Sequence, residues 1–473
     1  MTITEIKADL AEKIKAETGE NVFLCYQCLK CTVGCPMASY FDLEPNQVLR
    51  AAQLGLDDAA LNAKTPWLCA SCQTCTTRCP NGIDVARVMD FLVTEALSRG
   101  MTPKVPEVAL FNKVFLRNVN ILGRAYELGL ILEMNLRTGQ PFKDVPMGLE
   151  MMTKGKVNLA PAFVRPPRHA KSVQHNANQV AYYPGCSLHS LASEYNHSSY
   201  AVAGALGLEL VELEKWVCCG SSSAHRIDPQ RAVELPLRNL ALVEQMEMDE
   251  VALPCPACYS RFRAAQHETT LKPALKEQFA EKTGYTGQRE IAVHTLLEVM
   301  VNRIGLEAIA AKTTRPLSAL KVVCYYGCLL TRPPFLTGSD DPEYPLMMDR
   351  LLTAIGATPV DWGSRTSCCG GSISGTQTDI VIDFSGKILD DARAAGADAI
   401  VVACPLCHMN LDGRQHQILH AQAKSEAKKA GREIPVLYFT QLMALAFGLG
   451  EKAASISKNM INPKPLLSEK GCL

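Results

Sequence analysis

The sequence lacks several features that would mark other classes of protein. Its 48 Lys and Arg residues balance 48 Asp and Glu residues, so the formal net charge is zero. This balance argues against a nucleic-acid groove or a polybasic membrane patch. No apolar run is long enough to span a bilayer, and the first ten residues lack the apolar core of a signal peptide. We therefore expect a cytoplasmic protein with no nucleic-acid partner and no membrane span of its own.

A glycine-rich fingerprint for a flavin or nicotinamide is also missing after every predicted strand. The protein is therefore expected to receive any electrons it uses from a partner. Disulfide bonds are not needed for stability either, because a chain of 473 residues can form two to four domains and bury a sizeable core.

Against this background, 20 cysteines are heavy usage. A disulfide scaffold is one interpretation, but such scaffolds belong to small secreted domains. Nearly all of these cysteines fall into tight, repeated groups instead. The grouping favours metal ligation.

The first group is a pair of bacterial ferredoxin runs, Cys25-x-x-Cys28-x-x-Cys31-x-x-x-Cys35-Pro36 and Cys69-x-x-Cys72-x-x-Cys75-x-x-x-Cys79-Pro80. In such runs the fourth cysteine ligates the other cluster. We predict one [4Fe–4S] cubane on Cys25, Cys28, Cys31 and Cys79, and a second on Cys69, Cys72, Cys75 and Cys35. The fourth cysteine should open a helix, with its proline at the first helical position. Paired structural zinc sites are the alternative, although zinc needs only four ligands and no such proline.

The second group consists of two longer frames, each built around Cys-Cys-Gly. The first frame contains Cys186, Cys218, Cys219, Cys255 and Cys258, and the second contains Cys328, Cys368, Cys369, Cys404 and Cys407. Five cysteines are one more than a zinc site or a cubane needs. Adjacent thiolates can instead bind different irons of one cluster. We predict an iron–sulfur cluster in each frame, and redox chemistry between them.

The frames lie in an internal repeat that begins at Val180. DEVALPCPAC (249–258) aligns with DAIVVACPLC (398–407) without a gap, and the second copy carries about seven extra residues near Thr331 to Asp341. Each copy alternates predicted strands and helices, with Glu194-Tyr195 and Glu343-Tyr344 opening equivalent helices, and its cysteines follow strands. This pattern predicts two pseudo-symmetric α/β domains with mostly parallel sheets and ligands at the carboxyl ends of the strands.

The whole chain is thus expected to be an α+β multidomain protein. Helices are predicted over residues 4–18, 44–61 and 85–97, and a pair of packing helices over 107–136. The proline-containing stretch 139–178 is expected to be a linker or extended strap. The predicted domains are a mostly α-helical dicluster ferredoxin-like domain (1–100), a helical segment with a linker strap (101–178), two α/β domains (179–315 and 316–455) and a tail (456–473).

These residues carry a resemblance to the heterodisulfide reductase family. CYQCLKCTVGCP with CASCQTCTTRCP resembles its ferredoxin-type small subunit, and the two five-cysteine frames resemble its cysteine-rich catalytic subunit, whose units are called CCG domains. Both are fused here, ferredoxin part first, as in the fused subunit of the membrane-linked enzyme. Electron-transfer subunits of glycerol-3-phosphate, lactate and glycolate dehydrogenases carry such frames too, often degraded, so the complete frames here favour the disulfide-reductase branch.

The resemblance implies a noncubane [4Fe–4S] cluster in each frame, with a disulfide cleaved between the two clusters. It also implies a flavoprotein partner that docks near the ferredoxin-type clusters, further redox subunits, and a location that is cytoplasmic or peripheral to a membrane complex. The alternative is an electron relay that passes electrons to an acyl-CoA reductase, quinone or dehydrogenase module without turning over a substrate.

Several other side chains lie near the cysteine frames in sequence. His189, His225 and His408 are candidate proton donors to a departing thiolate, or are simply packed, and His294 is a weaker candidate. Ser221, Ser222 and Ser223 could face a cluster from a helix N-terminus or act as plain N-caps. We expect Cys324 to be a buried strand thiol and Cys472 to be an unpaired thiol in a polar tail. The extra residues at 331–341 either wall one side of the cleft or form a surface insertion without a role.

Overall fold

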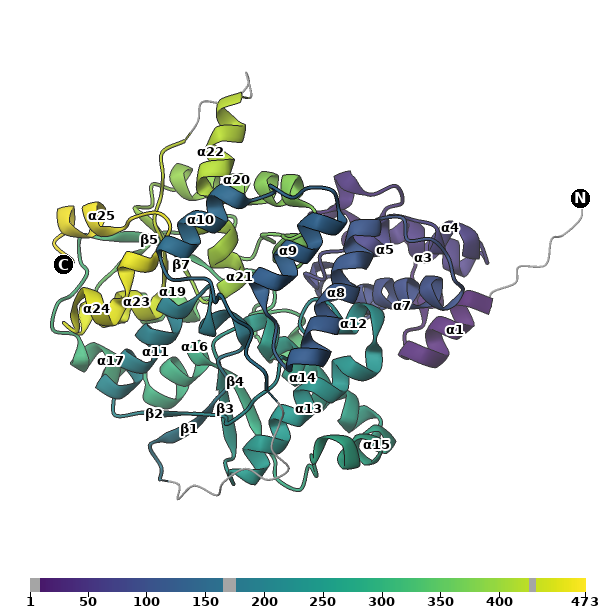
Figure 1. Cartoon of the computed structure of the whole chain (residues 1–473), viewed down its shortest axis with the longest axis horizontal. Helices are drawn as coiled ribbons and strands as arrows, with labels where there is room; N and C mark the ends of the chain where they lie inside the picture. Colours follow the sequence, from purple (N-terminus) through teal and green to yellow (C-terminus); the bar gives the residue numbers. More distant parts are fainter. Residues whose placement is uncertain (1–8, 165–175, 425–430) are drawn as a thin grey trace, which may run out of the picture.

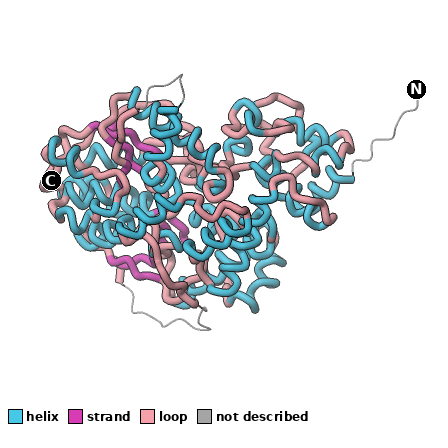
Figure 2. Tube along the Cα trace, turned by 45° about the horizontal axis from the view of Figure 1, so that its top comes forward, coloured by secondary structure: helices cyan, strands magenta, loops and turns pink. Residues whose placement is uncertain are grey.

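The structure is a computed structural model that describes residues 9–164, 176–424 and 431–473 (Figure 1). An all-helical N-terminal part lies at one end of the molecule, and two α/β units form the other end (Figures 1 and 2). The predicted fold class, a ferredoxin-like helical part followed by two repeated α/β units, is confirmed.

Each α/β unit contains a four-stranded sheet in which every pairing is parallel. The first sheet has the order β2-β1-β3-β4 and the second the order β6-β5-β7-β8. The strands are β1 (Gln179–Tyr182), β2 (Glu209–Glu212), β3 (Glu250–Leu253), β4 (Ala292–Thr295), β5 (Lys321–Tyr325), β6 (Thr358–Pro359), β7 (Ala399–Val402) and β8 (Val436–Tyr438). In both sheets the second strand in sequence lies on one side of the first strand and the third strand lies on the other side. Open parallel sheets bind their ligands at such a change in strand order.

Helices cover these sheets. Those of the first unit are α11 (Ser193–Ala205), α12 (Ala224–Ile227), α13 (Pro229–Gln245), α14 (Pro256–Leu271), α15 (Pro273–Thr283), α16 (Leu296–Glu298) and α17 (Leu306–Lys312). Those of the second unit and the C-terminal segment are α18 (Pro334–Thr337), α19 (Met347–Ala354), α20 (Thr378–Ala394), α21 (Pro405–His408), α22 (Gln415–Lys424), α23 (Phe439–Ala446), α24 (Gly450–Ala454) and α25 (Lys464–Glu469).

The N-terminal part consists of short helices around the two ferredoxin runs. They are α1 (Asp9–Thr18), α2 (Lys30–Val33), α3 (Pro45–Gln53), α4 (Asp57–Leu61), α5 (Thr65–Leu68), α6 (Thr74–Thr77) and α7 (Val85–Ser98). Residues 4–8 of the predicted first helix lie outside the described residues. The single helix predicted over 44–61 is wrong, because Gly55 adopts φ +67° between α3 and α4. Neither Pro36 nor Pro80 begins an α-helix, since Pro36 leads through a turn into a short 3-10 helix (Ala38–Tyr40) and Pro80 leads into a turn.

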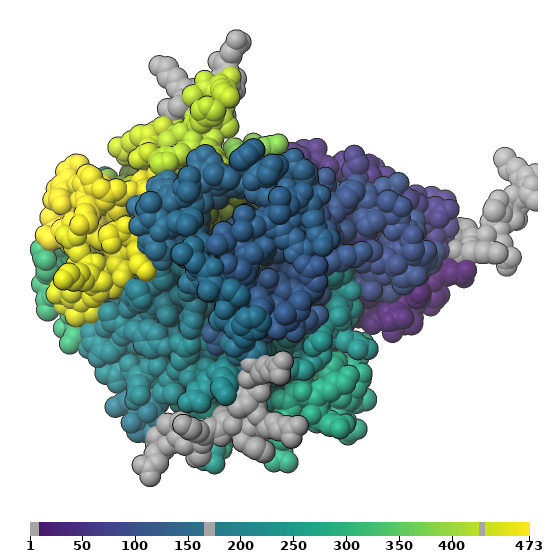
Figure 3. All heavy atoms as spheres, in the orientation of Figure 1, coloured from purple at the N-terminus to yellow at the C-terminus, as the bar shows by residue number. Residues whose placement is uncertain are grey.

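Between the helical part and the first sheet, three helices run across the face seen in Figure 1 and Figure 3. The predicted helix pair is present as α8 (Pro106–Leu122) and α9 (Glu127–Arg137). The expected extended strap is partly wrong, because α10 (Val145–Thr153) forms within it, and residues 165–175 lie outside the described part. Helices α9 and α10 leave several apolar side chains exposed, among them Leu136 and Leu149.

Two further predictions need correction. The helix expected from Glu343 begins only at Met347, because the Asp341 carboxylate accepts hydrogen bonds from the backbone N–H groups of Glu343 and Tyr344 and forms a turn there. Cys472 is 2% exposed and packs into the core beside α25, so it does not lie in a solvated polar tail. Cys324 is fully buried on β5, as predicted.

Candidate metal centre

The two ferredoxin runs fold into loops of the same shape. The residue before and the residue after the second cysteine adopt left-handed backbone conformations in both: Gln27 (φ 62°) and Leu29 (φ 66°) in the first run, Ser71 (φ 50°) and Gln73 (φ 61°) in the second. Residues other than glycine rarely adopt this backbone conformation. When it alternates along a loop, successive backbone N–H groups point toward one side, where an anion can bind. Both loops therefore have a backbone that suits an anionic group.

The fourth cysteine of each run lies beside the first three cysteines of the other run. A small cavity is lined by Cys25, Cys28, Cys31 and Cys79, together with Pro80. Cys35 lies instead with the second run, where burial and the charges of Cys72 and Cys69 raise the pKa of its thiol. The structure therefore brings together the two sets of four cysteines that the crossover assigns, and ligation by them stays a prediction.

The two five-cysteine frames lie at the carboxyl ends of the strands. Cys186 and Cys255 follow β1 and β3, which are neighbours in the first sheet, and Cys328 and Cys404 follow β5 and β7 in the second. Pro256 and Pro405, which come directly after Cys255 and Cys404, begin α14 and α21. At this first helical position proline loses no hydrogen bond, so each Cys-Pro-x-Cys motif joins a strand to a helix.

Glycines keep each frame open. A Cβ added to Gly185 would lie 3.1 Å from Cys258 Sγ, and one added to Gly327 would lie 3.0 Å from Cys407 Sγ. After each Cys-Cys pair, the N–H of Gly220 donates to Cys218 Sγ (3.4 Å) and the N–H of Gly370 donates to Cys368 Sγ (3.3 Å). Sulfur ligands that accept backbone N–H groups, in a cradle that side chains would fill, fit a cluster. This geometry differs from that of a single-ion site such as a zinc site. Among the described residues, no group of three or more His, Cys, Asp or Glu side chains is arranged to hold one metal ion.

The frames meet at equivalent residues. Hydrogen bonds from Cys258, in its own frame, and from Cys404, in the other, lower the pKa of Cys255. A cavity of about 50 Å³ lies here. Its lining includes Cys328, Cys368, Cys369, Cys404 and Cys407 of the second frame, Ser221, Ser222, His225, Pro256, Ala257 and Arg261 of the first repeat, and Ala70 and Ser71 of the second ferredoxin run.

The two frames have different neighbours. At the second frame, a hydrogen bond from Cys368 lowers the pKa of Cys72, a predicted cubane ligand, to about 6. At the first frame, the turn between α8 and α9 closes the site: the N–H of Ala125 donates to Cys186 Sγ (3.4 Å), and the N–H of Cys218 donates to the Gly123 carbonyl (2.9 Å). The ferredoxin part thus contacts the second frame, and the turn covers the first.

The three candidate histidines lie in different surroundings. His225 lines the cavity, and its Nδ1 lies 2.7 Å from Asp90 Oδ2; burial lowers its pKa and Asp90 opposes the shift. His189 is about one-third exposed and pairs with Glu212. Only His225 of these three lines this cavity. His294 lies on β4, and Ser223 precedes α12 without capping it through its side chain.

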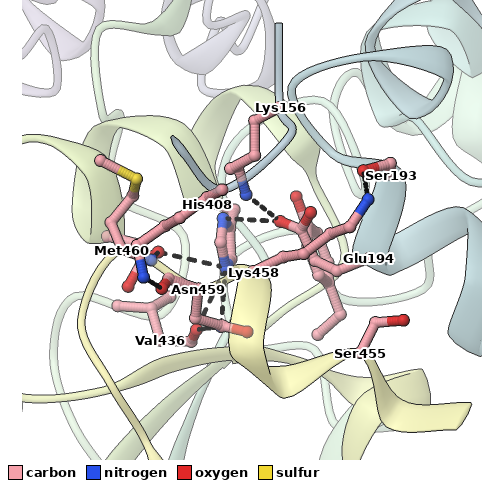
Figure 4. A network of polar contacts seen from close by, with 12 residues as sticks. Lys156, Ser193, Glu194, His408, Val436, Ser455, Lys458, Asn459 and Met460 are labelled. Carbon is pink, nitrogen blue, oxygen red and sulfur yellow. Dashed lines mark hydrogen bonds and ion pairs between the residues drawn. The ribbon is translucent and has the colours of Figure 1, made fainter. Parts of the chain in front are cut away.

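His408 belongs to a buried polar network (Figure 4). Its ring stacks on Tyr438 at 4.3 Å, and Nε2 lies 3.1 Å from the Val436 carbonyl. Burial lowers the pKa of His408 well below its ordinary value. Beside it, the Lys156 ammonium donates to Glu194, and both side chains are almost fully buried. This ion pair ties the segment after α10 to α11, and His408 of the second repeat packs against it.

The extra residues of the second repeat form part of an interface between domains. Arg332 is 3% exposed and donates to Thr74 of the second ferredoxin run (2.9 Å) and to the Thr366 carbonyl (3.1 Å). Arg263 of α14 donates to the Leu336 carbonyl (2.7 Å). Sequence reasoning missed Arg332 and the buried Arg226, because single arginines carry no motif; only the position of Arg332 in the insertion pointed toward it.

Comparisons with known proteins agree with this architecture. The family described as "Cysteine-rich domain" (CCG) matches residues 180–263 and 322–412, and "4Fe-4S dicluster domain" matches residues 24–84. The 8-methylmenaquinol:fumarate reductase membrane anchor subunit of Wolinella succinogenes is 32% identical over 291 residues, which are 61% of this chain and 99% of that protein.

Two further relatives correspond to the two kinds of part. One subunit of the ferredoxin:CoB-CoM heterodisulfide reductase of Methanosarcina mazei is 27% identical over 60% of this chain and 94% of its own length. One subunit of the H(2):CoB-CoM heterodisulfide,ferredoxin reductase of Methanothermobacter marburgensis is 34% identical over 22% of this chain and 58% of its own length. A hypothetical protein from Helicobacter pylori shares the fold, with a TM-score of 0.50 and 12% identity over 80% of this chain and 70% of its own.

Parallel α/β repeats with complete cysteine frames, joined to a dicluster ferredoxin part, define an iron–sulfur oxidoreductase. The chain belongs to the heterodisulfide reductase family and fuses parts similar to two different subunits of that enzyme, the ferredoxin-type one first. Its relatives are subunits of multi-subunit reductases. In the described part of the chain no helix is long and apolar enough to cross a membrane.

Proposed function

We propose that this protein is the iron–sulfur subunit of a disulfide reductase complex, and that it reduces a disulfide between its two five-cysteine frames. The observation that carries the proposal is the meeting of two complete frames at Cys255 and Cys404, beside a cavity with lining residues from both repeats. The S–S bond of R–S–S–R′ breaks, two electrons come from a reduced flavoprotein, and two protons complete the thiols RSH and R′SH.

The chain would hold four clusters, two cubane and two noncubane. Their ligands are the two crossed sets of four cysteines and the two frames of five cysteines named above. When bound, these groups supply one-electron steps and thiophilic iron. The protein's own contribution is to hold the frames against each other, to exclude bulk water from the cavity, and to place the imidazole of His225 in its wall as the candidate proton donor.

Electrons would enter at the first ferredoxin run. Cys28 is exposed there, and apolar side chains surround it in sequence, among them Tyr26 (63% exposed) and Val33 (84% exposed). Exposed apolar groups around a redox site favour a protein docking surface. From there the path leads to the second run, then to the second frame through the Cys72–Cys368 contact, and finally to the first frame. A flavoprotein is the proposed donor, in a complex that is cytoplasmic or peripheral to a membrane.

The second candidate is a relay without substrate turnover. The lining of the cavity favours it, because all five cysteines of the second frame line its volume of about 50 Å³, so a cluster bound there would occupy the space that a substrate needs. The name of the fumarate reductase relative also specifies a quinol and fumarate rather than a disulfide.

One experiment separates the two candidates. The complex is purified anoxically with its co-purifying subunits, reduced through its own donor, freed of excess reductant, and mixed with a small dialkyl disulfide. Disulfide reduction gives two thiols for every two electrons lost from the clusters, and Cys404→Ser abolishes this yield. If the clusters reoxidise only with a quinone or a redox protein and no thiol forms, the protein is a relay.

A further inference from the structure

The second ferredoxin run is held by two buried arginines that come from different repeats. Arg226, from α12 of the first repeat, is 2% exposed and donates to the backbone carbonyls of Cys69, Pro66 and Trp67. Arg332, from the insertion of the second repeat, donates to Thr74, between Cys72 and Cys75. The run therefore lies between one guanidinium from each repeat.

Both guanidinium groups keep an unused donor. The Nε–H groups of Arg226 and Arg332 are buried and have no hydrogen-bond partner in the described structure. A buried N–H without a partner is unfavourable, so such a donor is expected to have an acceptor in the working protein. Ser71 Oγ of the same run is also buried without a partner. Sulfides of a bound cluster are acceptors of the right kind.

The positive charges are only partly neutralised by protein groups. Glu343, which is 38% exposed, pairs with Arg332 and also with Arg78. Arg226 hydrogen bonds only to carbonyl groups, and the nearby carboxylate of Asp90 is paired with His225. Two buried guanidinium groups thus lie beside the second run, with the carboxylates of Asp90 and Glu343 near them, at a depth where salt screens little.

The first run has no such partners. No arginine or lysine side chain in the described ranges donates a hydrogen bond to residues 25–31, and its polar contacts come from amides such as Gln27, which donates to Cys25 Sγ (3.3 Å). Cys28 is exposed, whereas Cys72 is buried. The two runs share their loop shape and differ in the charge around them.

We propose that Arg226 and Arg332 are positioning residues that fix the second ferredoxin run between the two repeats and raise the reduction potential of its cluster above that of the first run. Reduction adds one negative charge to a cluster, and a nearby buried cation stabilises the reduced form more than the oxidised form. The two arginines thereby give electrons a downhill step from the first run toward the second frame. This inference rests on the cluster assignments of the proposed function and does not depend on disulfide turnover.

The test measures midpoint potentials in the holoprotein. Arg226→Gln and Arg332→Gln remove one charge each, and the two Lys variants retain it. Arg303→Gln is the matched control, because Arg303 also binds a carboxylate and two carbonyls but lies at the amino ends of β1 and β3, whereas the cysteine frames follow the carboxyl ends of the strands. Each variant is loaded to full iron content and titrated anoxically by electron paramagnetic resonance, with Cys28→Ser used to remove the signal of the first run.

Each Gln variant is expected to lower the potential of the second-run cluster, and the double variant to lower it further. The Lys variants should stay close to the parent potential, and Arg303→Gln should not change it. Unchanged potentials in fully loaded Gln variants would overturn the inference. If the Gln variants do not hold the cluster, the Lys variants decide: a parent-like potential supports the role of charge, and a fall in potential despite the retained charge contradicts it. Because no disulfide is present, failure of disulfide reduction leaves this result unaffected.

Discussion

The two α/β repeats have the same ligand frame and different surroundings. Their sheets have the same strand order, and Gly220 (φ 75°) and Gly370 (φ 74°) turn the chain in the same way after each Cys-Cys pair. The turn Gly123–Ala125 covers the first frame, whereas the second frame shares a core with the ferredoxin part through Cys368, Ile373 and Phe384. Both copies retain all five cysteines, and in the proposed electron path the neighbours give each copy a different place.

The largest expected effect comes from removing one ligand in either frame. Cys258→Ser and Cys407→Ser each remove the thiolate that packs against its Gly185 or Gly327 cradle. On four irons for each cluster, iron should fall from about sixteen to about twelve per chain in both variants, and disulfide reduction should be lost. Anoxic iron and sulfide analysis with a thiol assay checks this. A value near eight irons in the parent protein would mean that neither frame holds a cluster, and the two frames could then not be compared as cluster sites.

The next effect concerns the ion pair that anchors the segment after α10 beside the first repeat. Lys156→Met leaves Glu194 charged and buried without its cation, which should lower the free energy of unfolding by about 3–5 kcal/mol. Lys154→Met is the control, because Lys154 is half-buried and donates only to the Asn459 carbonyl (2.7 Å). Denaturation of both variants gives the difference.

The double variant Lys156→Met/Glu194→Leu sharpens this prediction. Removing both charges should recover most of the lost stability, because no uncompensated carboxylate remains. A single variant as stable as the parent protein would show that the buried pair does not anchor this segment.

A smaller effect is expected at His225, which has no histidine counterpart in the second repeat. His225→Gln should lower disulfide turnover by about 10²-fold. Because burial lowers the pKa of His225, its protonated form increases only below the ordinary histidine range, and turnover of the parent should rise as the pH falls there. The variant should lose this rise. His189→Gln, remote from the cavity, should retain it, and an identical pH profile for all three proteins would exclude His225 as the donor.

The smallest effect concerns one position at which the frames differ, Ser221 in the first and Gly371 in the second. A Cβ at Gly371 would lie 3.1 Å from Leu406 Cβ and 3.5 Å from Cys369 Sγ. Gly371→Ser should therefore lower stability by about 1 kcal/mol through overpacking. Ser221→Gly should leave the unfolding midpoint almost unchanged. Equal shifts for both variants would show that this difference between the repeats is incidental.

Sequence alone predicted much of this molecule, for physical reasons that the structure makes clear. Metal-ligand spacing is local, so the ferredoxin runs and the Cys-Pro-x-Cys motifs identified the family and the fold class. The arrangement of the domains depends on single contacts without periodicity, such as Arg332 with Thr74, and could not be read from a pattern. The break at Gly55 and the helix α10 were missed because helical periodicity does not locate a turn between two helices or a helix in a proline-containing stretch. The ligand sets and the domain boundaries stay predictions.

The central claim is that electrons reach the first frame only through the second. It is tested most directly by anoxic stopped-flow reduction of two variants, Cys218→Ser and Cys368→Ser, each shown to retain both cubanes and one frame cluster. We expect the second-frame cluster of Cys218→Ser to be reduced as fast as in the parent protein. The first-frame cluster of Cys368→Ser should be reduced at least about tenfold more slowly, because one electron-transfer contact is lost. Equal reduction rates in the two variants would contradict the central claim.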